Sequence, residues 1–215
     1  TNGEIIECSK FERADWFYAT LGGIGLTGII LEAKIQLRSV QSPWIHSETI
    51  PYHNLDEFFA LSDSAETDWE HTVSWIDCMN GANAKGLFAR GNLSSEHTQV
   101  EPKIKDKTFP ITPPISLVNK LSLPIFNFAY FHGNSLKKQP QKVHYEPFFY
   151  PLDAMHEWNK MYGPKGFYQY QSVVPKEIGK EITQEMLNAI KKSGEGSFLA
   201  VLKTFGDRES GGMLS

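Results

Sequence analysis

Two glutamines near residue 170 could bind a hydroxylated ligand. Gln169 and Gln171 stand two positions apart in an aromatic stretch, and the alternation predicts a strand at residues 167–174 that carries both amides on one face. Burying an amide without a hydrogen bond costs on the order of a few kcal/mol. This face is therefore either solvated or the wall of a polar pocket.

A lysine interrupts a second apolar row. Residues 197–205 predict another strand, on which Lys203 shares a face with apolar neighbours. Such a lysine either extends into water or directs its ammonium group at a ligand oxygen. Because a single helix joins the two predicted strands, we expect Gln169, Gln171 and Lys203 to converge on one cavity wall. The apolar residues on the face of Lys203 are Leu199, Val201 and Phe205.

A glycine-rich loop at residues 22–28 contains a formal G-x-G-x-x-G spacing. The dinucleotide-binding form of this motif follows a strand and opens a helix. Here the order is reversed, because the helical pattern of residues 11–20 precedes the loop. Residues 29–38 then alternate and predict a strand with one buried face. The glycines therefore close a tight turn, or they let the backbone lie against a flat ligand.

Other kinds of site have little support. None of the seven histidines shows H-x-x-x-H spacing, and Cys8 and Cys78 lack a C-x-x-C partner, so neither a metal site nor a disulfide framework is expected. No G-x-S-x-G nucleophile motif occurs. The net charge of −4 gives no basic footprint for nucleic acid. No apolar run is long enough to predict a membrane-spanning helix.

The segment WFYATLGGIGLTGIILEAKIQL resembles the end of the FAD-binding domain in the vanillyl-alcohol-oxidase family of flavoproteins. Further phrases follow in family order, including FYPLD, QYQ and KTFG. The resemblance covers most of the chain and is weakest at residues 92–145. Within the family it is strongest to the oxidases of lipid-linked pentoses. Sugar-1,4-lactone oxidases, of the D-arabinono-1,4-lactone oxidase type, are the next nearest group.

The resemblance implies an FAD-dependent oxidoreductase that moves a hydride from a sugar carbinol carbon to the flavin. It implies that residues 1–38 are the last strip of the FAD-binding domain and that residues 39–215 belong to the substrate domain. The matching catalytic residue is Lys203. The matching substrate-binding residues are Gln169, Gln171 and Phe205, with Phe149 and Leu152 at the mouth of the pocket. The matching FAD-binding residues are Gly22, Gly23, Gly25, Leu26, Thr27, Gly28 and Ile29.

One of these positions departs from the family. Phe149 stands where the nearest relatives have a tyrosine, so a hydroxyl contact is not expected there. The chain starts without Met, and the phosphate cradle of the flavin and a second basic residue are expected outside it. We therefore expect FAD in a longer parent protein and not in these 215 residues alone.

The expected partners are a small or lipid-linked sugar, the missing parts of the FAD domain, and a peripheral membrane contact. The expected location is the cytoplasm, at the periphery of the inner membrane. Two alternatives remain open. One is an aldonolactone oxidase, and the other is a non-catalytic, ferredoxin-like ligand-binding module.

The pattern of elements predicts an α+β domain, with a mostly antiparallel sheet covered by helices. Asn54 and Glu57 form a capping-box pattern that predicts a helix start. Residues 71–76 and 86–91 predict a hairpin around a turn at 80–83. Two further helices are predicted at residues 153–162 and 178–190. The proline-rich residues 92–124 predict a mobile lid, or a loop packed on the domain.

Overall fold

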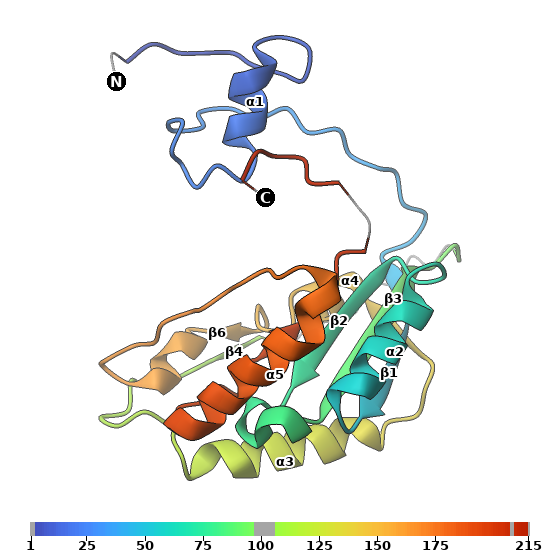
Figure 1. The fold of residues 1–215 in the computed structure, drawn as a ribbon, viewed down its shortest axis with the longest axis vertical. Coiled ribbons are helices and arrows are strands. Elements are labelled where there is room, and N and C mark those ends of the chain that lie inside the picture. Colours follow the sequence, from blue (N-terminus) through green and yellow to red (C-terminus); the bar gives the residue numbers. More distant parts are fainter. Residues whose placement is uncertain (1–2, 97–105, 207–208, 215) are drawn as a thin grey trace. The chain divides into compact units, whose positions relative to one another are not determined.

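The computed structural model describes residues 3–96, 106–206 and 209–214. The chain divides into two compact units (Figure 1). One unit combines Thr1–Ser39 with Phe205–Ser215, and the other contains Val40–Thr204. The larger unit carries the sheet and is described first.

The sheet of the larger unit has five strands in the order β5-β1-β3-β2-β7, and each pair of neighbours is antiparallel. The predicted hairpin is confirmed by β2 and β3. Between them, the predicted turn is a 3-10 segment, η1 (Cys78–Asn83), which contains Gly81 at φ 61°. The strand bounds are Trp44–Tyr52 for β1, His71–Ile76 for β2, Gly86–Leu93 for β3, Gln141–His144 for β5 and Val201–Leu202 for β7.

Two helices, α2 (Leu55–Ala65) and α5 (Lys176–Ser193), cover one face of this sheet. The capping box predicted for α2 is confirmed, since Asn54 Oδ1 accepts a hydrogen bond from the Glu57 amide at 2.9 Å. α5 ends at Gly194, whose left-handed conformation (φ 68°) closes the helix as expected for a glycine cap. Figure 1 shows both helices lying over the strands.

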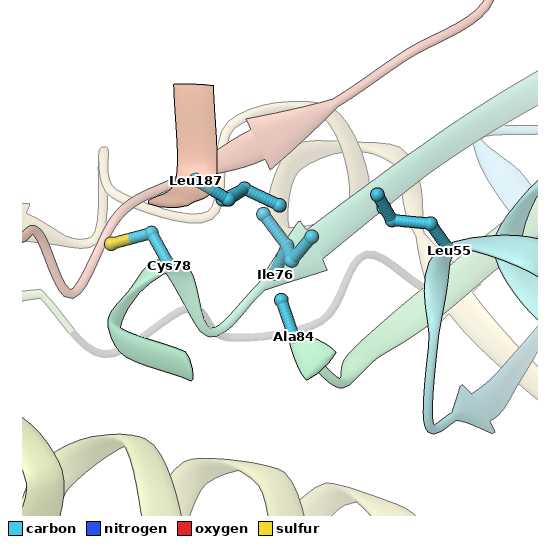
Figure 2. Packing of buried hydrophobic residues seen from close by; sticks show 5 residues of the cluster. All are labelled: Leu55, Ile76, Cys78, Ala84 and Leu187. Carbon is cyan, nitrogen blue, oxygen red and sulfur yellow. The ribbon is translucent and has the colours of Figure 1, made fainter. Parts of the chain in front are cut away.

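The core on the α2 and α5 side is built from small clusters of buried apolar side chains. One of them joins Leu55, Ile76, Cys78, Ala84 and Leu187, which Figure 2 shows gathering from α2, β2, η1 and α5. A second joins Tyr52, Phe58, Ala65 and Phe88. Burial of these side chains fixes the two helices on the sheet, because each buried Leu, Ile or Phe contributes about 1.5–3 kcal/mol of transfer free energy.

Part of the other face of the sheet is covered by α3 (Ser122–Ser135), which runs along the lower side of the unit in Figure 1. Its Phe131 packs with Trp75 and Leu87, whose side chains point away from α2. Sequence patterns did not predict this helix. The part of the predicted lid at 97–105 lies outside the described residues.

The helix predicted at 153–162 is wrong. That region holds a two-residue strand, β6 (Met155–His156), followed by a 3-10 segment, η2 (Trp158–Tyr162). Glu157 between them adopts φ 57°, which a right-handed helix does not allow. β6 pairs in parallel with β4 (Lys107–Thr108) and ties the middle of the proline-rich segment to the unit.

Two predicted strands are also corrected. Residues 167–174 and 29–38 are extended, but neither stretch pairs with another strand in the described part of the chain. Their apolar side chains are exposed, for example Ile29 at 90% and Tyr170 at 79%. A strand is defined by hydrogen bonds to a neighbouring strand, so the alternation of apolar and polar residues was not sufficient to predict one here. The predicted α+β class with a mostly antiparallel sheet is confirmed.

Candidate functional site

Lys203 lies immediately after β7, and the pairing of that strand decides which way it faces. β7 pairs with β2 so that Leu202 is opposite Ser74. Leu202 packs against the α2 and α5 clusters, and the Thr204 hydroxyl is hydrogen-bonded to Ser62 of α2. Side chains alternate along extended backbone, so Lys203 faces the opposite side of the sheet, where it is exposed.

The same side of β2 carries His71, Val73 and Trp75, because the intervening Ser74 points toward α2 and contacts the Tyr52 hydroxyl at 2.7 Å. Continuing the β2–β7 register by one residue places Lys203 beside Val73. We call the α3-side surface formed by His71, Val73 and Lys203 the open sheet face. It presents one ammonium group, one imidazole and an apolar floor.

An aromatic residue borders this face at the His71 end. Phe149 belongs to the short helix α4 (Tyr145–Phe149), and its ring meets that of His71 edge-on at 4.9 Å. α4 can approach the sheet because β3 has a glycine there: a Cβ on Gly91 would come within 2.7 Å of Phe148 Cζ. The predicted mouth residue Phe149 therefore lies next to His71, a residue that the sequence analysis did not select. The alternation of residues 71–76 could have placed His71 on the face of Trp75.

The two predicted glutamines lie on an exposed extended segment and not on a strand face. Its beginning is held by Phe167, whose ring stacks on Tyr162 at 4.4 Å, and its end by Ser172 Oγ, which lies 3.8 Å from Met186 Sδ of α5. Gln169 and Gln171 are both exposed. No hydrogen bond joins either amide to Lys203 within the described residues, and their convergence remains a prediction.

A row of aromatic rings connects the start of the glutamine segment to β2. Tyr162 stacks near Phe198, Phe198 contacts Phe126 of α3, and the row continues through Tyr130 to Trp75 at 4.9 Å. Trp75 Nε1 donates a hydrogen bond to the Phe198 carbonyl at 2.8 Å. The row holds α3, η2 and the β7 edge in one arrangement. Burial raises the pKa of the Tyr130 and Tyr162 hydroxyls, so both stay protonated near neutral pH.

The remaining predicted pocket residues are placed separately. Leu152 is half-buried, and its carbonyl accepts a hydrogen bond from the Met155 amide at 2.9 Å in the turn that follows α4. Phe205 is 63% exposed and belongs to the smaller unit. A shallow hollow of about 450 Å³ lies elsewhere in the larger unit. It is lined by Thr112, Asn159, Lys160, Gly163, Pro164, Gly166 and Phe167, and it contains none of the predicted site residues.

The glycine loop of the smaller unit follows α1 (Ala14–Thr20). Gly23 is required by packing, because a Cβ there would lie 2.1 Å from the Ala19 carbonyl oxygen. Gly25 and Gly28 differ, since a Cβ at either position would meet nothing within 4 Å. Both have positive φ, and Thr27 fixes the loop through its hydroxyl contact with Thr20 at 2.9 Å.

These features fit a backbone strip against which a flat ligand could lie, as an FAD would. Gly25 and Gly28 leave the backbone bare at two positions, and Leu26 and Ile29 add exposed apolar side chains. The close packing at Gly23 supports the interpretation of the loop as a tight turn. Contact of the loop with a flat ligand remains a prediction.

Comparison with known proteins shows a clear similarity to a curated oxidase. The chain is 34% identical over 219 residues to the decaprenylphosphoryl-beta-D-ribose oxidase of Mycolicibacterium smegmatis (strain ATCC 700084 / mc(2)155). The chain is similar to part of this oxidase. The match covers 95% of the chain, which confirms the resemblance predicted from the sequence. No family model matches the chain.

The chain spans about half the length of this oxidase, 47% of its residues. The name of this relative states that it oxidises a lipid-linked ribose. The aligned part of the chain includes both the glycine loop and Lys203. Within residues 3–96, 106–206 and 209–214, no helix is long and apolar enough to cross a bilayer.

Proposed function

We propose that the protein is an FAD-dependent oxidoreductase that oxidises a carbinol carbon of a lipid-linked pentose. The observation that carries this proposal is the 34% identity to decaprenylphosphoryl-beta-D-ribose oxidase over nearly the whole chain. In this proposal residues 1–38 line the flavin nucleotide, and residues 39–215 form the substrate domain.

The FAD would lie along the strip formed by Gly22, Gly23, Gly25, Leu26, Thr27, Gly28 and Ile29. Positive φ at Gly25 and Gly28 and the open space beside them support this assignment. When bound, the flavin supplies the hydride acceptor for the alcohol. The backbone strip contributes orientation only, because it carries no charged side chain.

The substrate would bind on the open sheet face. There the Lys203 ammonium donates hydrogen bonds to a sugar or phosphate oxygen, which orients the carbinol group and stabilises negative charge. Gln169 and Gln171 bind the ring hydroxyls as both donors and acceptors. Phe149 and Leu152 would shield the reacting carbon from water. Phe205 is proposed as a substrate-binding residue from the resemblance alone.

The lipid part of the substrate implies work at a membrane. We infer a peripheral contact on the cytoplasmic side of the inner membrane, since a lipid-linked substrate would be presented at a bilayer and the described residues expose apolar side chains. The membrane contact does not alter the roles proposed for the residues of the open sheet face.

Anaerobic flavin reduction by the full-length protein tests the proposal. A decaprenylphosphoryl pentose should bleach the flavin absorbance, and an aldono-1,4-lactone should not. Bleaching by the lactone alone would instead establish the aldonolactone oxidase. A full-length protein that purifies without flavin and cannot be loaded would favour the non-catalytic binding module.

A further inference from the structure

The outer side of α3 carries large apolar side chains that the described residues of the larger unit leave mostly exposed. The inner side is buried through Leu123 and Phe131, each 3% exposed. At helical spacing on the opposite side lies a second apolar row. Its members are Leu121 (82% exposed), Ile125 (73%), Phe128 (61%) and Leu136 (85%). A helix that is apolar on both sides requires a second apolar environment.

The charge around this row is of one sign. Residues 107–145 contain no Asp or Glu, in a chain whose net charge is −4. The lysines in this range are Lys107, Lys120, Lys137, Lys138 and Lys142. Lys120 precedes the helix, and Lys137 and Lys138 follow it, so both ends of the apolar row are basic.

A cation from a neighbouring element lies beside Phe128 of this row. Lys85 Nζ lies 5.7 Å from the ring centre of Phe128 and 4.4 Å from that of Phe131. The carboxylate that α3 contacts, Asp77, is on the buried side, where it accepts a hydrogen bond from Asn127 Nδ2 at 2.7 Å. Lys142 is paired with Glu96 at 2.6 Å, which leaves the lysines at the helix ends as the main charges.

We propose that the outer row of α3, with its basic ends, docks in the plane of an anionic lipid bilayer. An apolar helix face flanked by lysines is the arrangement of interfacial helices, which bury the apolar side to the headgroup boundary while lysines pair with anionic lipids. The 14-residue helix lies flat in this arrangement. The inference deepens the membrane contact of the proposed function by naming its surface and its lipid class.

Vesicle co-sedimentation of the full-length protein tests this surface without any substrate. The protein should bind vesicles of phosphatidylcholine with phosphatidylglycerol and bind pure phosphatidylcholine much less. Reversal of Lys137 and Lys138 to Glu should lower the partition coefficient by about thirtyfold or more, since each lysine near the surface is worth about a factor of five. The matched control is the same reversal of Lys191 and Lys192 at the end of α5, which should leave binding unchanged.

A second variant pair tests the apolar row. Ile125→Glu should lower vesicle binding about tenfold or more, whereas Ile178→Glu, at a 45% exposed isoleucine of α5, should not. Three outcomes would overturn the proposal. They are equal binding to both vesicle types, an equal loss of binding in a variant and its matched control, and a dimer that only Ile125→Glu dissociates. Flavin reduction by a soluble short-chain substrate stays intact in these variants, so failure here is distinct from failure of the proposed activity.

Discussion

Lys203 is the side chain whose proposed role in catalysis can be tested most directly without a change in folding stability. It is exposed and follows a strand of only two residues, so its removal leaves the core intact. In the full-length enzyme, Lys203→Ala should lower kcat/KM by about tenfold or more, a loss of roughly 1.4 kcal/mol in transition-state binding. Lys192→Ala on α5 is the matched control and should have no effect. Unchanged kinetics in Lys203→Ala would remove Lys203 from the site.

The two cysteines should differ in reactivity. Cys78 is 2% exposed, and burial raises the pKa of its thiol, with Asp77 nearby adding to the effect. A raised pKa keeps the thiol protonated where an ordinary cysteine ionises, and thiolate is the reactive form. At pH 8, iodoacetamide should therefore modify half-buried Cys8 at least about tenfold faster than Cys78, as followed by peptide mass spectrometry. Similar rates would show that the cluster of buried side chains around Cys78 opens readily.

Single residues were predicted well where the signal was local. Asn54 and Glu57 revealed the start of α2 because a cap depends on neighbours within one turn. His71 and Phe149 meet across distant parts of the chain, and their contact depends on the absence of a side chain at Gly91. No spacing in the sequence encodes that approach.

At the scale of elements, the cap of α2 gives a measurable stability. Asn54→Ala removes the acceptor of the Glu57 amide, so the free energy of unfolding should fall by about 1 kcal/mol in urea denaturation. Asn54→Asp keeps an acceptor oxygen and should lose little. An alanine variant as stable as the parent would mean that solvent replaces the cap fully.

The seat of α4 on β3 should connect stability to substrate binding. A Cβ on Gly91 would approach Ile45 and Phe148 to 2.7 Å, so Gly91→Ala should cost about 1–3 kcal/mol and displace α4 with Phe149. In the full-length enzyme KM should rise more than kcat falls. Gly133→Ala on α3 is the control, because a Cβ there meets nothing within 4 Å and alanine favours a helix. Loss of stability in both variants would argue against a specific contact at Gly91.

The elements that sequence patterns predicted correctly have signals that lie close together in the sequence. β2 and β3 pair across a short connection, and α5 has a clear amphipathic period with a glycine cap. α3 was missed because Pro124 and its two apolar sides hide the helical period. Residues 29–38 and 167–174 alternate like strands, but pairing is a long-range property that alternation does not contain.

At the scale of the whole molecule, flavin binding should depend on more than these residues. The glycine strip offers backbone but no cationic cradle for phosphates, and the homologue is about twice as long. We expect the 215 residues alone to purify without the flavin absorbance band and the full-length protein to retain it. A stoichiometric flavin spectrum for the 215 residues would contradict this, and would make the strip sufficient for binding.

The division of the chain into units also bears on synthesis. The smaller unit is assembled from Thr1–Ser39 and Phe205–Ser215, and Met213 donates a hydrogen bond to the Tyr18 carbonyl across them at 3.0 Å. On the ribosome, the first segment must therefore remain incomplete until all of Val40–Thr204 has emerged. Once that intervening unit has folded, it holds the chain between the two segments compact, which lowers the entropy cost of bringing them together. A mutation that slows folding of the sheet in the larger unit should thus delay folding of the glycine loop in the smaller unit.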